Sequence, residues 1–142
     1  MRQLILVLAL ILASWSALAA DVKSATCIFV EGTSHFFEDG KLTYRMARER
    51  ERLEMTFDRL DDKNGNGRLV ANNGGADVLV RRGQFTINIF EFTPVGNVNV
   101  TTMLTRDVVH GGKVQVVHSR HVANLPGLLP SQRVGTCTVF TH

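Results

Sequence analysis

The stretch ADVLVRRGQFTINI, residues 76–89, is the clearest β-hairpin in the sequence. Apolar and polar residues alternate with period two on both sides of Arg82-Gly83, which is typical of a half-buried antiparallel pair. A two-residue turn at Arg82-Gly83 would place three apolar pairs on one face: Val80 with Phe85, Val78 with Ile87, and Ala76 with Ile89. The alternation shifts at Phe90 and Phe92, which predicts a bulge or a twisted strand end.

The segment that follows predicts a second hairpin. A strand over residues 97–109 would share one apolar face among Val98, Val100, Leu104 and Val108. A three-residue loop, His110-Gly111-Gly112, would lead into a strand over residues 113–122, with glycine in the left-handed position. This loop sets Val108 against Val114 and Leu104 against His118. His118 would then face the core or the rim, and His121 would face outward.

The segments before the first hairpin complete an all-β prediction. Leu53, Met55 and Phe57 alternate as in a strand, whereas residues 41–52 fit either a helical stripe or strands with charges alternating by face. Strands are favoured there because Thr43-Tyr44 and Thr56-Phe57 have high β propensity. We therefore expect seven to eight antiparallel strands, arranged as a meander barrel or a sandwich.

The two cysteines, Cys27 and Cys137, lie near the two ends of the expected domain, each in strand-like sequence. In an oxidising compartment they are expected to form a disulfide, and a catalytic thiol is the less favoured interpretation. The bridge would close a loop of about 110 residues and stabilise the fold by about 5 kcal/mol in the chain-entropy model. It would also make the first and last strands neighbours, as in a closed barrel or a sandwich with adjacent terminal strands.

Residues 1–20 resemble a secretory signal peptide. A basic start at Arg2 precedes an apolar run over residues 4–13, and Ala17-Leu18-Ala19 fits a small-x-small cleavage site. The run is about half the roughly 20 residues that a membrane anchor needs, so cleavage after Ala19 or Ala20 is favoured. The prediction is an exported protein, periplasmic or extracellular, with one β domain over residues 21–142.

Length and charge limit the partners to be considered. The 142 residues, 44% of them apolar, suit a single domain, and the formal net charge is only +3. Arg2 would be lost with the signal peptide, and nucleic-acid binding needs a clustered basic face, so no nucleic-acid partner is expected. Nothing after the signal peptide is long and apolar enough to span a bilayer, so no membrane span is expected in the mature chain.

The most site-like cluster is His118-Ser119-Arg120-His121. His118 and Arg120 would share a strand face and could hold an anion or a carboxylate. His121 would lie on the opposite face, so the two histidines could chelate one metal ion only across a bulge. The Asn/Gly turn with Asn72 and Asn73 is a second candidate, because loops carry many binding sites. Our ligand-binding candidates are His118, Arg120, His121, Asn72 and Asn73.

Recognised catalytic, metal and cofactor motifs are weak in this sequence. Residues 62–67, DKNGNG, resemble the first half of a calcium loop, but the twelfth position is Asn73 instead of the bidentate Glu, so a polar hairpin loop is favoured. There is no nucleophile elbow, phosphate-cradling glycine loop or H-E-x-x-H motif. We assign no catalytic residue, no metal site and no cofactor from the sequence.

Several short motifs together resemble small exported bacterial β-rich proteins of uncharacterised function. They are Asn72-Asn73-Gly74, Glu91-Phe92-Thr93 with Gly96-Asn97, Thr101-Thr102, His118-Ser119-Arg120-His121, and Pro130-Ser131-Gln132 with Gly135-Thr136-Cys137. The resemblance covers about residues 53–137. It implies a periplasmic β-rich domain and no particular activity.

The leading hypothesis is therefore an exported non-catalytic β domain that binds a small ligand or a partner protein. One alternative is a metal-binding protein or hydrolase that uses His118 and His121. Another is an envelope-associated structural or inhibitor protein that acts through a flat face, with an envelope protein as its partner. A hollow barrel with a cavity above about 300 Å³ would favour a small ligand, and a filled core would favour a protein partner.

Overall fold

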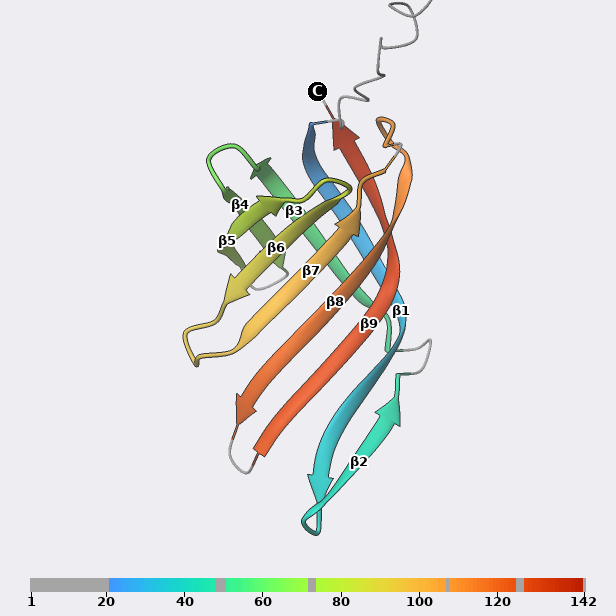
Figure 1. The fold of residues 1–142 in the computed structure, drawn as a ribbon, viewed down its shortest axis with the longest axis vertical. Helices are drawn as coiled ribbons and strands as arrows, with labels where there is room; N and C mark the ends of the chain where they lie inside the picture. The colour runs from blue at the N-terminus through green and yellow to red at the C-terminus, as the bar shows by residue number, and fades with distance from the viewer. Residues whose placement is uncertain (1–20, 48–50, 72–73, 107, 125–126, 142) are drawn as a thin grey trace, which may run out of the picture.

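The structure is a computed structural model that describes residues 21–47, 51–71, 74–106, 108–124 and 127–141 (Figure 1). Its regular structure consists of nine β-strands: β1 (Val22–Glu38), β2 (Lys41–Met46), β3 (Leu53–Asp61), β4 (Asn66–Ala71), β5 (Gly74–Arg82), β6 (Thr86–Phe92), β7 (Val98–Leu104), β8 (Lys113–Asn124) and β9 (Gly127–Thr141). Among the described residues we find no helix with the length and apolar character that crossing a bilayer requires. The expected signal peptide, residues 1–20, lies outside the described residues.

Eight of the strands form a closed antiparallel barrel. From β3 to β9 each strand pairs with the next along the chain, β1 pairs with β3, and β9 pairs back onto β1. The all-β prediction is thus confirmed, and of its two architectures the barrel is the one observed. β2 pairs only with the last part of β1, from Thr33 to Glu38, so it lies beyond the barrel wall (Figure 1). Residues 41–46 are therefore strand, as the sequence favours.

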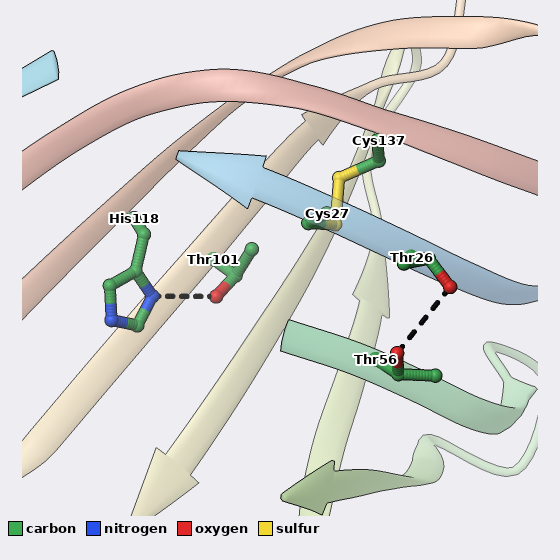
Figure 2. The surroundings of a disulfide bond; sticks show 6 residues. All are labelled: Thr26, Cys27, Thr56, Thr101, His118 and Cys137. Carbon is green, nitrogen blue, oxygen red and sulfur yellow. Dashed lines mark hydrogen bonds between the residues drawn. A yellow bond between two sulfur atoms is a disulfide. The ribbon is translucent and has the colours of Figure 1, made fainter. Parts of the chain in front are cut away.

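The Cys27–Cys137 disulfide joins the two terminal strands at the point where they close the barrel (Figure 2). Both cysteines are fully buried, and every second side chain of the surrounding strands points into the same apolar core. The largest of these buried side chains are Phe29, Phe57, Leu60, Ile87, Ile89 and Met103. The predicted bridge and the predicted adjacency of the terminal strands are both confirmed.

In the hairpin over residues 76–89 the predicted faces are right for the strands, but the predicted partners are wrong and Phe85 lies exposed in the turn. Val80 pairs with Ile89 instead of Phe85, a shift of four residues. An even shift keeps every side chain on its face, so Val78, Val80, Ile87 and Ile89 are all buried. The turn is longer than expected: Gly83 N donates to Thr86 O (2.8 Å), and Phe85 lies against the Arg106 guanidinium (5.4 Å from the ring centroid). Phe90 and Phe92 continue the alternation on the outer face, so no bulge forms there.

In β7 the predicted faces are reversed. Thr101 pairs with His118 and Met103 with Val116, so the expected pairs of Leu104 with His118 and Val108 with Val114 do not form. The inner face of β7 carries Asn99, Thr101 and Met103, all buried, whereas Val98, Val100 and Leu104 face outward. The physical reason is cross-strand packing, because Val100 lies opposite Phe90 and Val98 opposite Phe92 on the outside of the barrel.

The calcium-like stretch over residues 62–67 belongs to the β3–β4 hairpin. Asp61 pairs with Asn66, and the Asp61 Oδ1 accepts hydrogen bonds from the backbone N–H groups of Lys63 (3.1 Å) and Asn64 (3.0 Å). The Asp62 carboxylate is ion-paired with Arg82. The segment is the polar hairpin loop that the sequence favours.

Candidate functional site

The barrel has one extended end, formed where the three longest strands, β1, β8 and β9, run past their neighbours (Figure 1). We call this end the mouth. Side chains opposite each other on paired antiparallel strands point to the same face. Following the pairing around the inner face of the mouth gives one polar residue from each of six strands: Glu91, Asn99, Arg120, Ser131, Ser34 and Arg45. We call these six residues the polar row.

A second layer of polar residues lies one step deeper into the barrel. Thr101, His118 and Arg133 are cross-strand neighbours on β7, β8 and β9. Arg133 pairs with Gly32 of β1, where an added Cβ would lie 2.7 Å from Arg133 Cγ. The nearest atom to such a Cβ is the backbone carbonyl oxygen of Gln132, so the close approach of β9 leaves no room for a side chain at position 32.

His118 is held rigidly in this second layer. Its Nδ1 and Thr101 Oγ1 form a 2.9 Å hydrogen bond (Figure 2), in which the imidazole tautomer decides which atom is the donor. The ring of His118 lies 5.5 Å from that of Phe29. The residue is only 2% exposed. Burial, and then the positive charges of Arg120 and Arg133, lower the pKa of His118 to about 4. The imidazole is therefore neutral near pH 7.

A hollow of about 510 Å³ opens over the β1, β2, β8 and β9 part of the polar row. Its lining consists of Ser34, His35, Phe36, Arg45, Arg120, Val122 and Ser131. Two guanidinium groups and two hydroxyl groups thus meet beside the apolar walls formed by Phe36 and Val122. Below the hollow the barrel is filled by buried apolar side chains, which is the outcome expected to favour a protein partner. The space that could hold a small molecule is confined to the mouth.

Positive charge exceeds negative charge around this hollow. Arg45 lies 3.6 Å from the Glu51 carboxylate, and Arg133 donates to the Glu51 backbone carbonyl (2.8 Å). Within the described part of the chain Arg120 forms no ion pair, and the buried Glu51 Oε2 has no hydrogen-bond partner. The one acid of the polar row, Glu91, lies at the far end and accepts a 2.6 Å hydrogen bond from Asn99 Nδ2. The local charge therefore favours a negatively charged ligand beside Arg120.

The structure separates the residues that the sequence grouped as a site. Arg120 belongs to the polar row, and His118 lies buried in the layer below it, facing the core as predicted. His121 is exposed on the opposite face, also as predicted. Ser119 shares that outer face and accepts a 3.1 Å hydrogen bond from Gln132 Nε2, so it points away from His118. The candidates Asn72 and Asn73 lie outside the described residues.

Most polar residues of the site were missed from the sequence. On β6 and β7 these are Glu91, Asn99 and Thr101. The others, Ser34, Arg45, Ser131 and Arg133, come from the two ends of the chain and meet only because β9 pairs with β1. The available signal was the polar alternation of Ser131 and Arg133 in a strand that the cysteines already placed beside β1. Across the described residues there is no group of three His, Cys, Asp or Glu side chains that could hold a metal ion.

A second hollow of about 640 Å³ lies on the outside of the barrel, across β3, β4, β5 and β6. Leu79, Phe90 and Phe92 form its apolar part, and Arg59 and Arg68 supply positive charge. It is an open groove with no hydroxyl side chain in its lining, so the convergence of charged and hydroxyl groups is found at the mouth. No family model matches the chain, and neither does any curated protein or any solved structure.

Proposed function

We propose that the protein is a binding domain that takes a small anionic ligand, bearing a carboxylate or phosphate group, at the mouth of the barrel. The observation that carries this proposal is the meeting of Arg45 and Arg120 with Ser34 and Ser131 in one hollow. The guanidinium group is a fork of N–H donors that fits carboxylate and phosphate oxygens in pairs. Hydroxyl groups from the two serines can donate further hydrogen bonds to the same anion.

The size and walls of the hollow support a small molecule with an apolar part. Ligand sites for small molecules commonly have volumes of roughly 300–1,000 Å³, with mostly apolar walls and a few polar groups that fix orientation. At about 510 Å³ the mouth falls within that range, and Phe36 and Val122 offer the apolar contact. We therefore expect the anionic group near Arg120 and the carbon skeleton against these two side chains.

Binding is favoured over catalysis because the histidine of the site is poorly placed for proton transfer. His118 is buried below the polar row and hydrogen-bonded to Thr101 through Nδ1. A general base with a pKa of about 4 is weak near pH 7. Ser119, the hydroxyl next to it in sequence, is on the other face of the strand.

We further infer that the protein works outside the cytoplasm, in the periplasm or the extracellular space. The buried disulfide supports this location, because such bridges persist in oxidising compartments. The signal-like residues 1–20 point the same way.

Calorimetric titration at low ionic strength tests the anion site, with inorganic phosphate and succinate as probes. We expect at least one probe to bind the wild type, and Arg120→Gln to weaken it about tenfold or more, since a charge-assisted hydrogen bond is worth about 1.5–3 kcal/mol. Arg68→Gln, on the outer groove, is the matched control and should bind as the wild type does. The proposal fails if neither probe binds, or if Arg120→Gln and Arg68→Gln bind equally well.

A further inference from the structure

β2 has a free backbone edge. Asp39 and Gly40 form the turn between β1 and β2 with positive φ angles of 51° and 74°, and Glu38 pairs with Lys41 across it. In such a two-residue hairpin the closing pair is hydrogen-bonded, and hydrogen-bonded pairs then alternate along the ladder. The hydrogen bond from Ala47 N to Gly32 O (2.8 Å) fits the same alternation of hydrogen-bonded pairs. The N–H and C=O groups of Leu42, Tyr44 and Met46 therefore point away from β1.

No other described strand takes up those groups. In the strand order β2 is terminal, with β1 as its single neighbour. Figure 1 shows the β1–β2 hairpin projecting below the barrel, with β2 on its outer side. An unpaired strand edge of this kind is a template for another extended chain.

The side chains along this edge form an apolar strip. Leu42, Tyr44 and Met46 are 61%, 68% and 58% exposed, and Phe37, opposite Leu42, is 53% exposed. The rings of Tyr44 and His35 lie 6.3 Å apart on the same face. Four large apolar side chains exposed side by side are typical of an interaction surface.

The opposite face of β2 selects the partner by charge. Lys41 and Arg45 alternate with the apolar residues, and β2 contains no acidic residue. In the antiparallel register that aligns the apolar strips, Lys41 would face Ala47 of a second copy and Arg45 would face Thr43, so self-pairing gives neither cation an acidic neighbour. An acidic strand would give one to both, so charge complementarity favours an acidic partner over a second copy.

We propose that β2 binds an extended segment of a partner protein by strand addition, and that this segment alternates apolar and acidic residues. The apolar residues would lie beside Leu42, Tyr44 and Met46, and the acidic residues beside Lys41 and Arg45. The main-chain groups of the segment would bond to the free edge of β2. This proposal shares Arg45 with the anion site, but it depends on the backbone edge of β2 and its apolar strip and does not involve Arg120.

The probe is a labelled peptide of about seven residues, a common strand length, that alternates valine and glutamate. We expect it to bind the purified protein in fluorescence anisotropy, and amide exchange at Leu42, Tyr44 and Met46 to slow. A peptide of the same composition with its valines and glutamates in two blocks should bind at least tenfold more weakly. Two further peptides carry N-methyl groups on alternate residues, one at the odd positions and one at the even positions. One of the two should lose binding and the other should keep it, because only every second N–H group of the peptide faces β2.

Tyr44→Pro is the test on the protein side, because it removes one N–H from the free edge and none from the β1–β2 ladder. Tyr44→Pro should weaken the binding of the alternating peptide at least tenfold. It should bind phosphate and succinate as the wild type does. The proposal is overturned if the alternating and block peptides bind equally well, or if both N-methylated peptides bind. It is also overturned if the wild type forms dimers that Tyr44→Pro abolishes, because the occupant is then a second copy.

Discussion

At the residue scale, the main feature of this protein is a polar inner face at one end of an apolar barrel. His118 and His121 lie three positions apart on β8, yet one is 2% exposed and hydrogen-bonded and the other is exposed on the outside. The period-two geometry of a strand makes this separation unavoidable. The same geometry brings Arg120 to the mouth directly above His118.

The neutral state of His118 predicts a pH dependence of stability. Its pKa is about 4 in the folded protein, against the ordinary histidine pKa of 6.5 in an unfolded chain, so the unfolded state binds the proton more readily between these limits. The contribution of His118 to the free energy of unfolding does not change above pH 6.5. It falls as the pH drops from 6.5 to 4, by on the order of 3 kcal/mol. In urea unfolding at several pH values, His118→Gln should lose this part of the slope.

His121→Gln is the matched control on the same strand. Its stability should follow the wild-type pH profile, because the exposed His121 side chain has no corresponding burial. The prediction is wrong if the free energy of unfolding of His118→Gln varies with pH as that of the wild type does. His118 would then bind protons equally well in the folded and unfolded states.

At the element scale, β1 and β9 approach each other closely at Gly135. Gly135 pairs with Phe29 beside the irregularity in β1 between Phe29 and Glu31, and an added Cβ would overlap the carbonyl oxygen of Ile28. Because the obstructing atom belongs to the backbone, β1 and β9 could move apart to make room only by breaking some of the hydrogen bonds between them. Glycine at 135 is therefore a condition for closing the barrel with this register.

We expect Gly135→Ala to lower the free energy of unfolding by about 2–3 kcal/mol, the range of an overpacked site. Gly40→Ala, in the β1–β2 turn, is the comparison: an added Cβ there meets nothing within 4 Å, and only its φ of 74° is strained. That change should cost about 1 kcal/mol. Equal urea midpoints for the two variants would contradict the close approach at Gly135.

β7 shows where sequence reasoning about an element fails. The order Asn97-Val98-Asn99-Val100-Thr101 alternates equally well with either face inside, and burial of the valines is the ordinary choice. The actual choice depends on neighbours in β6 and β8: Asn99 lies between Glu91 and Arg120, and Val100 lies beside Phe90. Such a preference depends on pairing partners and cannot be derived from the strand itself.

At the scale of the whole molecule, the fold was largely predictable from two cysteines and from period-two alternation. Cys27 and Cys137 in strand-like sequence required adjacent terminal strands, and an antiparallel meander with adjacent ends closes naturally into a barrel. A smaller part of the candidate site was predictable too, because Arg120 and His118 share a strand face. The rest needed the strand registers, among them that of β1 and β9, which places Ser34 opposite Ser131.

The disulfide predicts a large loss of stability when it is removed. Cys27 and Cys137 are 110 residues apart, and the chain-entropy model assigns about 5 kcal/mol to a loop of this length. We expect Cys27→Ala/Cys137→Ala to lose about 2–5 kcal/mol in urea unfolding under oxidising conditions. An unchanged midpoint would mean that the bridge does not constrain the unfolded chain.

The pairing of β1 with β9 also sets an order of folding events. A chain that emerges N-terminus first can form the hairpins between neighbours from β3 to β8 as each strand appears. β1 must wait for the last fifteen-residue strand before its long ladder and its disulfide can form. Contacts between distant parts of a chain form slowly, so barrel closure is expected to be the late, rate-limiting step. Until then one edge of β1 stays open, and this is the interval in which the chain is most prone to aggregate.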